Sequence, residues 1–421
     1  MQQTAEIRLV TAVLFASALL LPSRVVGQDS IGLDNGLPWN TNWARIDEGN
    51  ENLWSLLDRG GGPLECGGWI SAGFTANAHG NRTGKGNAPL PLNSIADAPV
   101  MNQLWLYAEK PLDRERMGAD WGFRIDYLFG VDGPEMQAAG DQGWDFGWNT
   151  SRDYGSAIPQ LYAELGFHEL VLRVGYAIGL QGFEANQAVD NFFYSHNYAY
   201  GYGVPGTFSG AVLEYELSDN LAVLGGWTTG WDSWWSNYLS ASTFVGGLTW
   251  TLSDEVSLTY HVTIGDFGDG TAKNGAKSNA GQIYAHAIVF TCEISERASY
   301  VLENTLGSNS HTGVGSGNSQ WYSLTNYLFY DLSDCWSAGA RIEWFCDEDG
   351  QRVNVNGAGP GSFYEGTLGI NWEPHGNIRI RPEVRWDWFT GQGRPFDSRN
   401  GGMTGTSVHQ FTGGLDVLLI F

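Results

Sequence analysis

One stretch near the C-terminus, Ile378–Trp388, constrains the fold more than any other part of the sequence. It reads I-R-I-R-P-E-V-R-W-D-W, so apolar or aromatic side chains alternate strictly with charged ones. Side chains alternate across a β-strand, whereas a helix would mix the two sets around its circumference. The stretch therefore predicts a strand with one apolar and one charged face. Such a strand belongs either to a soluble antiparallel sheet or to a wall between lipid and a water-filled lumen.

The composition favours the membrane alternative. Charged residues make up 16% of the 421-residue chain, aromatic residues make up 14%, and there are 58 glycines. Soluble domains average about 25% charged residues, and a membrane-spanning helix needs an apolar run of about 18 residues or more, which this sequence lacks. These features together are typical of a transmembrane β-barrel. The formal net charge of −24 disfavours nucleic acid as a partner, because its phosphates would be repelled.

The N-terminus predicts export. Arg8 precedes the apolar run Leu9–Leu21, which has the length of a signal-peptide core, and small residues near Gly27 offer a cleavage site. We therefore expect residues 1–27 to be a signal peptide for Sec-type export, residues 28–65 a periplasmic or plug-like extension, and residues 66–421 the barrel. The spacing of the four cysteines supports neither a disulfide nor a zinc site. We expect no metal and no cofactor.

Short turns and long loops alternate along residues 66–421. The tripeptide Leu-Ser-Asp, which favours tight turns, recurs at residues 217–219, 252–254 and 332–334. The long loops are rich in Gly, Asn, Asp and Ser, and they are Gly80–Val100, Val131–Ser156, Gly179–Gly206, Trp231–Ala241, Gly265–Asn279, Gly307–Ser319, Asp347–Ser362 and Thr390–Val408. Strict alternation places all turns at one end and all loops at the other, as in outer-membrane barrels. The predicted fold is an all-β, transmembrane, antiparallel up-and-down barrel of about sixteen strands, with short periplasmic turns and long extracellular loops.

The inward positions of these strands are candidates for the lining of a pore. Charge that faces lipid is costly, whereas charge that faces water can set ion selectivity. The predicted pore-lining residues, assigned by strand parity, are Arg124, Asp126, Glu164, Arg173, Arg341, Glu343, Arg379, Arg381, Glu383, Arg385 and Asp387. We expect the row Arg379, Arg381 and Arg385 to form an electrostatic constriction. The alternative is that these charges pair across strands and only stiffen the wall.

The third long loop, Gly179–Gly206, is the most aromatic one. It is expected either to fold inward and narrow the pore or to pack outside on its neighbours. The candidates for a constriction are Phe192, Phe193, Tyr194, His196 and Tyr198. At the other end of the chain, the aromatic Phe421 on an alternating last strand resembles the signal that barrel-assembly machinery recognises. That machinery and outer-membrane lipid are therefore expected partners.

One segment also resembles a known family. Residues 192–198 (F-F-Y-S-H-N-Y), followed by Tyr202, Gly203, Pro205 and Gly210, resemble part of the OmpL-like β-barrel porin family. Residues 68–70, 104–109 and 225–232 are similar to further parts of it. The resemblance covers most of residues 66–421 and implies a bacterial outer-membrane porin, without implying a substrate. Where members tend to have Thr-His-Thr-Gly, this chain has T-F-S-G at residues 207–210, so no function tied to that His is implied.

We expect a passive, water-filled channel for small hydrophilic solutes or ions, and no enzyme. One alternative is a barrel hydrolase acting on lipid or peptide, for which Ser195 and His196 are the pair to test, although the chain lacks Gly-x-Ser-x-Gly and His-Glu-x-x-His motifs. The other alternative is a soluble Trp-rich protein that binds polysaccharide. The transported solute, the ion preference and the oligomeric state, a homo-oligomer included, stay open.

Overall fold

The computed structural model describes most of the chain from residue 63 onward. The described residues are 63–79, 86–113, 118–138, 144–145, 147–151, 153–234, 242–267, 269–271, 277–279, 281–310, 318–397 and 404–421. No helix within these residues is both long enough and apolar enough to cross a membrane. The predicted signal peptide, and the predicted extension as far as residue 62, lie outside the described residues.

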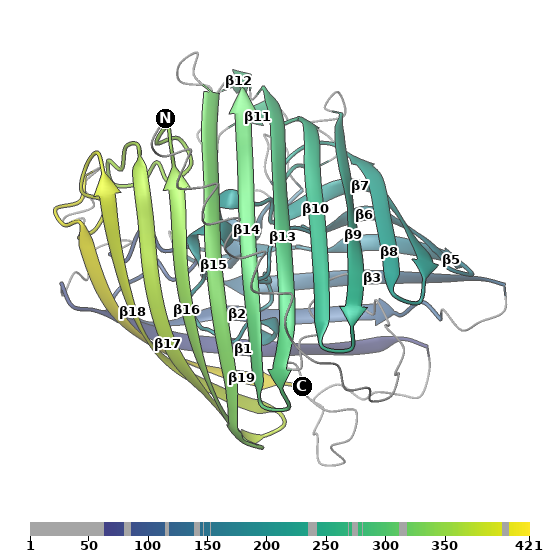
Figure 1. Ribbon diagram of the computed structural model, residues 1–421, viewed down its shortest axis with the longest axis horizontal. Helices are drawn as coiled ribbons and strands as arrows, with labels where there is room; N and C mark the ends of the chain where they lie inside the picture. Colours follow the sequence, from purple (N-terminus) through teal and green to yellow (C-terminus); the bar gives the residue numbers. More distant parts are fainter. Residues whose placement is uncertain are drawn as a thin grey trace. The chain divides into compact units, whose positions relative to one another are not determined.

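The main sheet closes into an antiparallel barrel, in which each strand pairs with its neighbours in chain order (Figure 1). β4 (Gly155–Ala157) and β5 (Leu161–Phe167) both pair with β3 (Ala119–Gly130), so they occupy one position in the wall. The sheet's 17 segments therefore make sixteen strand positions, which confirms the predicted fold. The remaining wall strands are β1 (Glu65–Asn77), β2 (Pro99–Lys110), β6 (Leu170–Ile178), β7 (Thr207–Ser218), β8 (Leu221–Thr228), β9 (Thr243–Ser253), β10 (Val256–Asp266), β13 (Gln282–Ser295), β14 (Ala298–Ser310), β15 (Asn318–Ser333), β16 (Trp336–Asp347), β17 (Gly361–His375), β18 (Ile378–Gly391) and β19 (His409–Ile420).

The first and last strands close the barrel. β1 pairs with β19 in a register that sets Trp69 opposite Ile420, and the backbones of Gly68 and Phe421 exchange two hydrogen bonds of 2.9 Å. Glu65 lies opposite Glu109, beside the short connection from β2 to β3, so the barrel begins and ends at the turn side. Closure leaves the wall with no free edge at which another chain could add a strand.

The connections differ at the two ends as expected. The three Leu-Ser-Asp turns join β7 to β8, β9 to β10 and β15 to β16. The long connections hold what helical and additional strand structure the described residues have. These elements are α2 (Gly133–Met136), the 3₁₀ turn η2 (Ala188–Asp190), the π-helical turn η3 (Ala199–Gly203), and the hairpin of β11 (Asp269–Thr271) with β12 (Lys277–Asn279).

The two faces of the wall carry opposite chemistry. In β18 the side chains of Arg381 and Arg385 are at most 2% exposed, whereas Val384 and Trp386 on the other face are 46% and 51% exposed. Exposed apolar side chains on the outer face suit contact with lipid. Stacked aromatic pairs lie near both ends of this wall, such as Trp336 with Trp372 at 5.4 Å and Tyr364 with Trp388 at 5.2 Å, as aromatic girdles do.

Two strands, β13 and β14, carry apolar side chains on both faces in addition to polar ones. Val289 and Val301 point inward, and both are buried against Phe192 and Phe193 of the long connection between β6 and β7. Apolar side chains such as Val289 and Val301 therefore occur on the inner face because they pack against a loop inside the barrel instead of facing water.

Candidate functional site

The connection between β6 and β7, residues 179–206, lies inside the barrel against the inner faces of β14 to β18. Arg341 of β16 donates a hydrogen bond of 2.7 Å to the carbonyl oxygen of Ser195, and Arg385 of β18 donates one of 2.5 Å to that of His196. Arg381 donates to the carbonyl oxygens of Ala188 and Asn191 at 2.8 and 2.7 Å. Of the two alternatives for this loop, the structure therefore shows the inward one.

Carboxylates of the same wall hold the N–H groups of the loop. Glu383 accepts hydrogen bonds from the backbone N–H groups of Tyr194 and Ser195 at 2.9 and 3.1 Å. Glu343 accepts from those of Tyr198 and Ala199 at 2.6 and 2.7 Å. Hydrogen bonds to an ionised acceptor are the strong kind, and buried backbone groups outside regular structure need such partners. The charged wall thus helps to fix the path of the loop.

The wall arginines also pair with carboxylates. Arg381 forms a two-pronged pair with Asp416 of β19, at 2.8 and 2.7 Å. Arg341 pairs with Glu365 of β17 at 2.6 Å, and Arg385 pairs with Asp387 at 2.8 Å. Apart from Asp416, all of these paired side chains come from three adjacent strands, β16, β17 and β18. Since each arginine has both a carboxylate and a loop carbonyl, none depends on water for its hydrogen bonds.

Aromatic residues of the loop complete the contact. Phe192 packs on Phe329 with ring centroids 5.0 Å apart, and the guanidinium of Arg341 lies 4.9 Å from the ring centroid of Phe193. The hydroxyl of Tyr198 donates a hydrogen bond of 2.8 Å to Asp387. A Cβ atom at Gly339 would lie 2.5 Å from the Phe192 ring, so the glycine at this inward position makes room for the loop.

Glu184 ties the two ends of the loop together. Its Oε1 atom accepts a 2.6 Å hydrogen bond from Arg341, while Oε2 lies 2.9 Å from Nδ1 of His196 and accepts from the backbone N–H of Asn197. Burial alone would raise the pKa of Glu184, but the charge of Arg341 and the contacts with His196 and Asn197 lower it to about 2. The carboxylate is therefore charged and fully engaged.

Four of the eleven predicted lining residues form a second, separate group on β3, β5 and β6. Arg124 pairs with Asp126 at 2.8 Å and with Glu109 at 3.1 Å, and Arg173 pairs with Glu164 at 2.7 Å. The other seven lie on β16 and β18. Arg379 belongs to them through its pair with Glu373 at 2.5 Å and its hydrogen bond to the carbonyl oxygen of Val189 at 2.8 Å. The structure thus brings the eleven residues together as two groups, and their role in ion selectivity stays a prediction.

Sequence reasoning missed four acidic residues of this site. Glu365 and Asp416 occupy inward positions of regular strands, so strand parity could have identified both. Glu303 of β14 accepts a 3.0 Å hydrogen bond from the backbone N–H of Phe183 and also occupies an inward position of a regular strand. Glu184 lies in an irregular loop, where no periodicity points to a role.

The pair Ser195 and His196 is not arranged as a nucleophile and its base. The Ser195 hydroxyl accepts a 3.2 Å hydrogen bond from Arg341, and the His196 ring stacks on Tyr200 at 4.2 Å while its Nδ1 atom faces Glu184. Both residues are buried. Their contacts within the described residues are those of a structural anchor.

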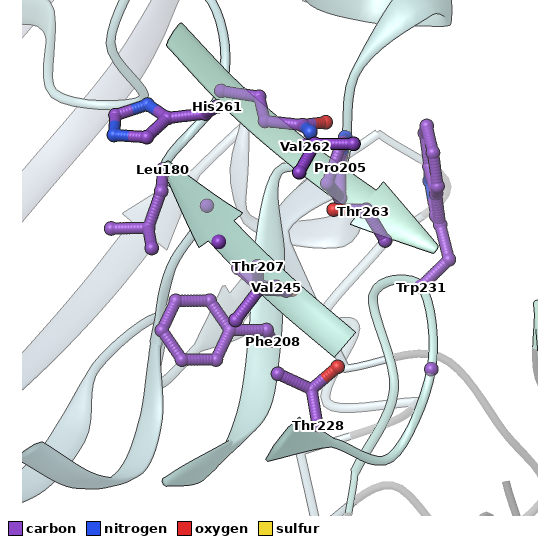
Figure 2. A pocket seen from close by; sticks show the side chains of 14 residues that line it. Leu180, Pro205, Thr207, Phe208, Thr228, Trp231, Val245, His261, Val262 and Thr263 are labelled. Carbon is purple, nitrogen blue, oxygen red and sulfur yellow. The ribbon is translucent and has the colours of Figure 1, made fainter. Parts of the chain in front are cut away.

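The opposite part of the interior, beside β7 to β10, is lined mainly by uncharged groups, and Asp232 after β8 accepts hydrogen bonds from the backbone N–H groups of Gly206 and Thr207. A small pocket lies between the loop and strands β7 to β10 (Figure 2). Figure 2 shows side chains from both sides gathered around this space, and the labelled ones are Leu180, Pro205, Thr207, Phe208, Thr228, Trp231, Val245, His261, Val262 and Thr263. Hydroxyl, apolar and aromatic groups thus replace the ion pairs of the charged wall.

The connection between β16 and β17 also contacts the loop. Arg352 lies between the rings of Trp231 and Trp321, 5.0 and 4.5 Å from their centroids, and its Nε–H donates a 2.7 Å hydrogen bond to the carbonyl oxygen of Tyr202. Burial lowers the pKa of Arg352 to about 10, so it stays protonated at neutral pH. The Arg352 side chain thereby links the β16–β17 connection to the β8–β9 connection, through Trp231, and to the β6–β7 loop, through Tyr202.

Comparison with protein-family models identifies the family of this chain. The family model described as "Putative beta-barrel porin-2, OmpL-like" matches residues 63–421. No curated protein sequence matches the chain.

Solved structures share the fold at low sequence identity. The outer-membrane channel DcaP of Acinetobacter baumannii is 11% identical, with 85% of this chain and 97% of that one covered and a TM-score of 0.55. An anion-selective porin from Comamonas acidovorans is 9% identical, with 85% and 99% covered and a TM-score of 0.53. The Vibrio cholerae outer-membrane protein OmpT, described as a trimer form, is 9% identical, with 85% and 99% covered and a TM-score of 0.51. At these identities the likeness concerns the fold alone.

Proposed function

The chain belongs to the OmpL-like β-barrel porin-2 family and is an outer-membrane porin, and we propose that it conducts small hydrophilic solutes and ions passively past the inward loop, residues 179–206. The observation that carries the proposal is the clamp on this loop, whose carbonyl and N–H groups are held by charged side chains of β16 and β18. A loop fixed inside a barrel narrows whatever path remains.

The predicted constriction residues support this proposal by their positions. Phe192, Phe193, Tyr194, His196 and Tyr198 are each at most 6% exposed and lie between the wall and the rest of the loop. We infer that they set the width of the channel by holding the loop in place, and not by touching the solute. On the same grounds, Arg381 and Arg385 influence ion preference first through the position of the loop.

The experiment is single-channel recording in planar bilayers. The wild-type protein should give stepwise conductance, and deletion of residues 191–200 should raise it, because the segment clamped to the wall is removed. Val245→Ala, on the opposite side of the interior, is the control and should leave conductance near the wild-type value. Equal conductance of the wild type and the 191–200 deletion would contradict the proposed constriction, and no conductance at all would contradict the channel.

We further propose how the protein is exported and inserted into the membrane, and that it forms a homo-oligomer. Signal cleavage near Gly27 precedes insertion, and the barrel-assembly machinery recognises the last strand with Phe421, whose backbone pairs with Gly68 at the closing seam. The trimer named for the Vibrio cholerae protein supports a homo-oligomer for this chain too. N-terminal sequencing of the mature protein checks the cleavage site, and Phe421→Ser should lower the yield of inserted barrel if the last residue is part of the signal.

A further inference from the structure

Three hydrogen-bonding side chains lie on the outer face of the barrel. They are His286 of β13, Asn304 of β14 and Asn326 of β15. The residues beside two of them, Glu303 and Tyr327, are 1% exposed and point inward. Since side chains alternate across a strand, the asparagines point outward, and His286 lies between the buried inward-facing Ala285 and Ala287. We call these three residues the amide patch.

The amide patch lies at membrane depth. Tyr322 and Tyr330 are the outward aromatic residues near the two ends of β15, about 26 Å apart along the strand at about 3.3 Å per residue. Asn326 is midway between them in sequence. With a strand tilt of about 40° this distance corresponds to about 20 Å of height, close to the apolar band of about 25 Å between aromatic girdles, so Asn326 faces the middle of the hydrocarbon layer. Asn304 lies directly opposite Leu324 of the same strand, within the same band.

Apolar side chains surround the patch. Ile342, directly opposite Asn326 on β16, is 62% exposed, Leu328 is 49% exposed and Leu306 is 38% exposed. On the other described wall strands the outward positions between the girdles carry apolar or aromatic residues, glycine or cysteine, such as Leu213 of β7 and Val384 of β18. A polar centre with an apolar border therefore distinguishes β13 to β15 from the rest of the outer surface.

The barrel satisfies the patch only in part. Asn326 Oδ1 accepts a 2.7 Å hydrogen bond from the Tyr300 hydroxyl, and Asn304 Nδ2 donates one of 2.7 Å to the carbonyl oxygen of Ser323. His286 Nδ1 lies 2.9 Å from the Tyr284 hydroxyl, and the His286 side chain also forms a hydrogen bond with that of Asn304. Within the described part of the chain, Asn326 Nδ2 has no acceptor. Lipid tails offer none either, and an unsatisfied amide in hydrocarbon is costly.

We propose that the amide patch is the surface on which a second copy of this chain docks, an inference that rests on the outer-membrane location in the proposed function. A rotation axis normal to the membrane keeps each residue at its depth, so a neighbouring copy presents the same amides at the same height. A carboxamide has both donors and an acceptor, which makes the patch self-complementary. Lipid headgroups lie beyond the tyrosines at the strand ends and do not reach Asn326.

The test is site-specific photo-crosslinking of the full-length protein in native outer membranes. A benzophenone amino acid replaces Ile342 at the border of the patch, and in a control chain it replaces Leu213 on the far wall, which is 41% exposed. The expected product is an adduct of two copies of this chain, identified by mass spectrometry, from position 342 and not from position 213. An adduct with another protein, no adduct, or equal adducts from both positions would overturn the proposal.

A second variant removes the hydrogen bonds and keeps the apolar surface. Asn304→Leu together with Asn326→Leu should weaken association about three- to tenfold for each hydrogen bond lost between membrane-embedded side chains, measured as the oligomer fraction after dilution in detergent. An unchanged or larger oligomer fraction would contradict the proposal. Planar-bilayer conductance of the same preparations separates the two ideas: loss of the adduct with normal conductance overturns only the docking surface, whereas an adduct without conductance overturns only the channel.

Discussion

The two sides of the barrel interior hold the same loop by different means. On the side of β16 to β18, ion pairs and charged side chains clamp the backbone of residues 188–199. On the side of β7 to β10, apolar and hydroxyl side chains line a pocket next to residues 179–181 and 205–207. Among the described residues no ion pair joins the loop to β7–β10, while Glu184 and His196 on the loop take part in such pairs toward β16.

This difference shows that charge on an inner wall need not be available to ions. Arg341 and Arg385 are at most 1% exposed, and their donors are shared between carboxylates and loop carbonyls. Breaking a buried pair leaves an uncompensated charge, whereas an uncharged wall loses only packing. Variants on the two sides should therefore differ in both stability and conductance.

The largest effect is expected at Arg341. Arg341→Ala should lower the free energy of unfolding by about 3–5 kcal/mol, because it strands the buried carboxylates of Glu184 and Glu365. Urea unfolding in detergent micelles measures this loss. Arg173→Ala is the matched control, since Arg173 pairs with Glu164 on the other charged group, and its loss should be smaller. Equal losses would show that the loop contact adds nothing.

Arg381 should affect ion preference. Arg381→Ala removes a cation, leaves Asp416 without its two-pronged partner and frees the carbonyl oxygens of Ala188 and Asn191. The reversal potential across a salt gradient should shift toward cation preference, with a stability loss of about 3 kcal/mol. A shift toward anions, or no shift, would remove Arg381 from any account of selectivity.

The contribution of the buried Asp132 carboxyl group to stability should change with pH in the opposite direction to that of Glu184. Burial raises the pKa of Asp132, which accepts a 3.0 Å hydrogen bond from Gln103, to about 7. A raised pKa contributes stability that is complete below the pKa of the unfolded chain and is lost as pH rises through about 7. Wild-type stability should therefore fall by about 2 kcal/mol between pH 5.5 and 8.5. Asp132→Asn should flatten this part of the unfolding profile, and an unchanged slope would exclude Asp132 as its source.

The smallest effect is expected on the uncharged side. Val245→Ala should cost about 1–2 kcal/mol, because it enlarges the pocket by two methyl groups without exposing a charge. Conductance and reversal potential should stay at wild-type values, since no loop backbone group is released. A change in conductance comparable to that of Arg381→Ala would mean that both sides of the interior position the loop.

The regular part of this structure could be predicted because strand periodicity is local. The alternation in residues 378–388 and the recurring Leu-Ser-Asp turns led to the sixteen positions and to the outward and inward sets. The interior could be predicted less well, because the contacts that fill it join the loop to wall residues up to 193 positions away, as between Ala188 and Arg381. The inward apolar residues of β13 and β14 did carry a signal, since a strand that faces water has no reason to be apolar inside. The arginine row was identified by parity, yet its partners Glu184 and Asp416 decide what it does.

The measurement that tests the central claim most directly is the single-channel conductance of Arg381→Ala/Arg385→Ala beside the wild type and the control Arg173→Ala. If the charged wall holds the loop across the path, the double variant conducts in larger steps than the other two proteins. If all three conduct equally while the double variant remains folded, the loop clamp does not set the width of the channel.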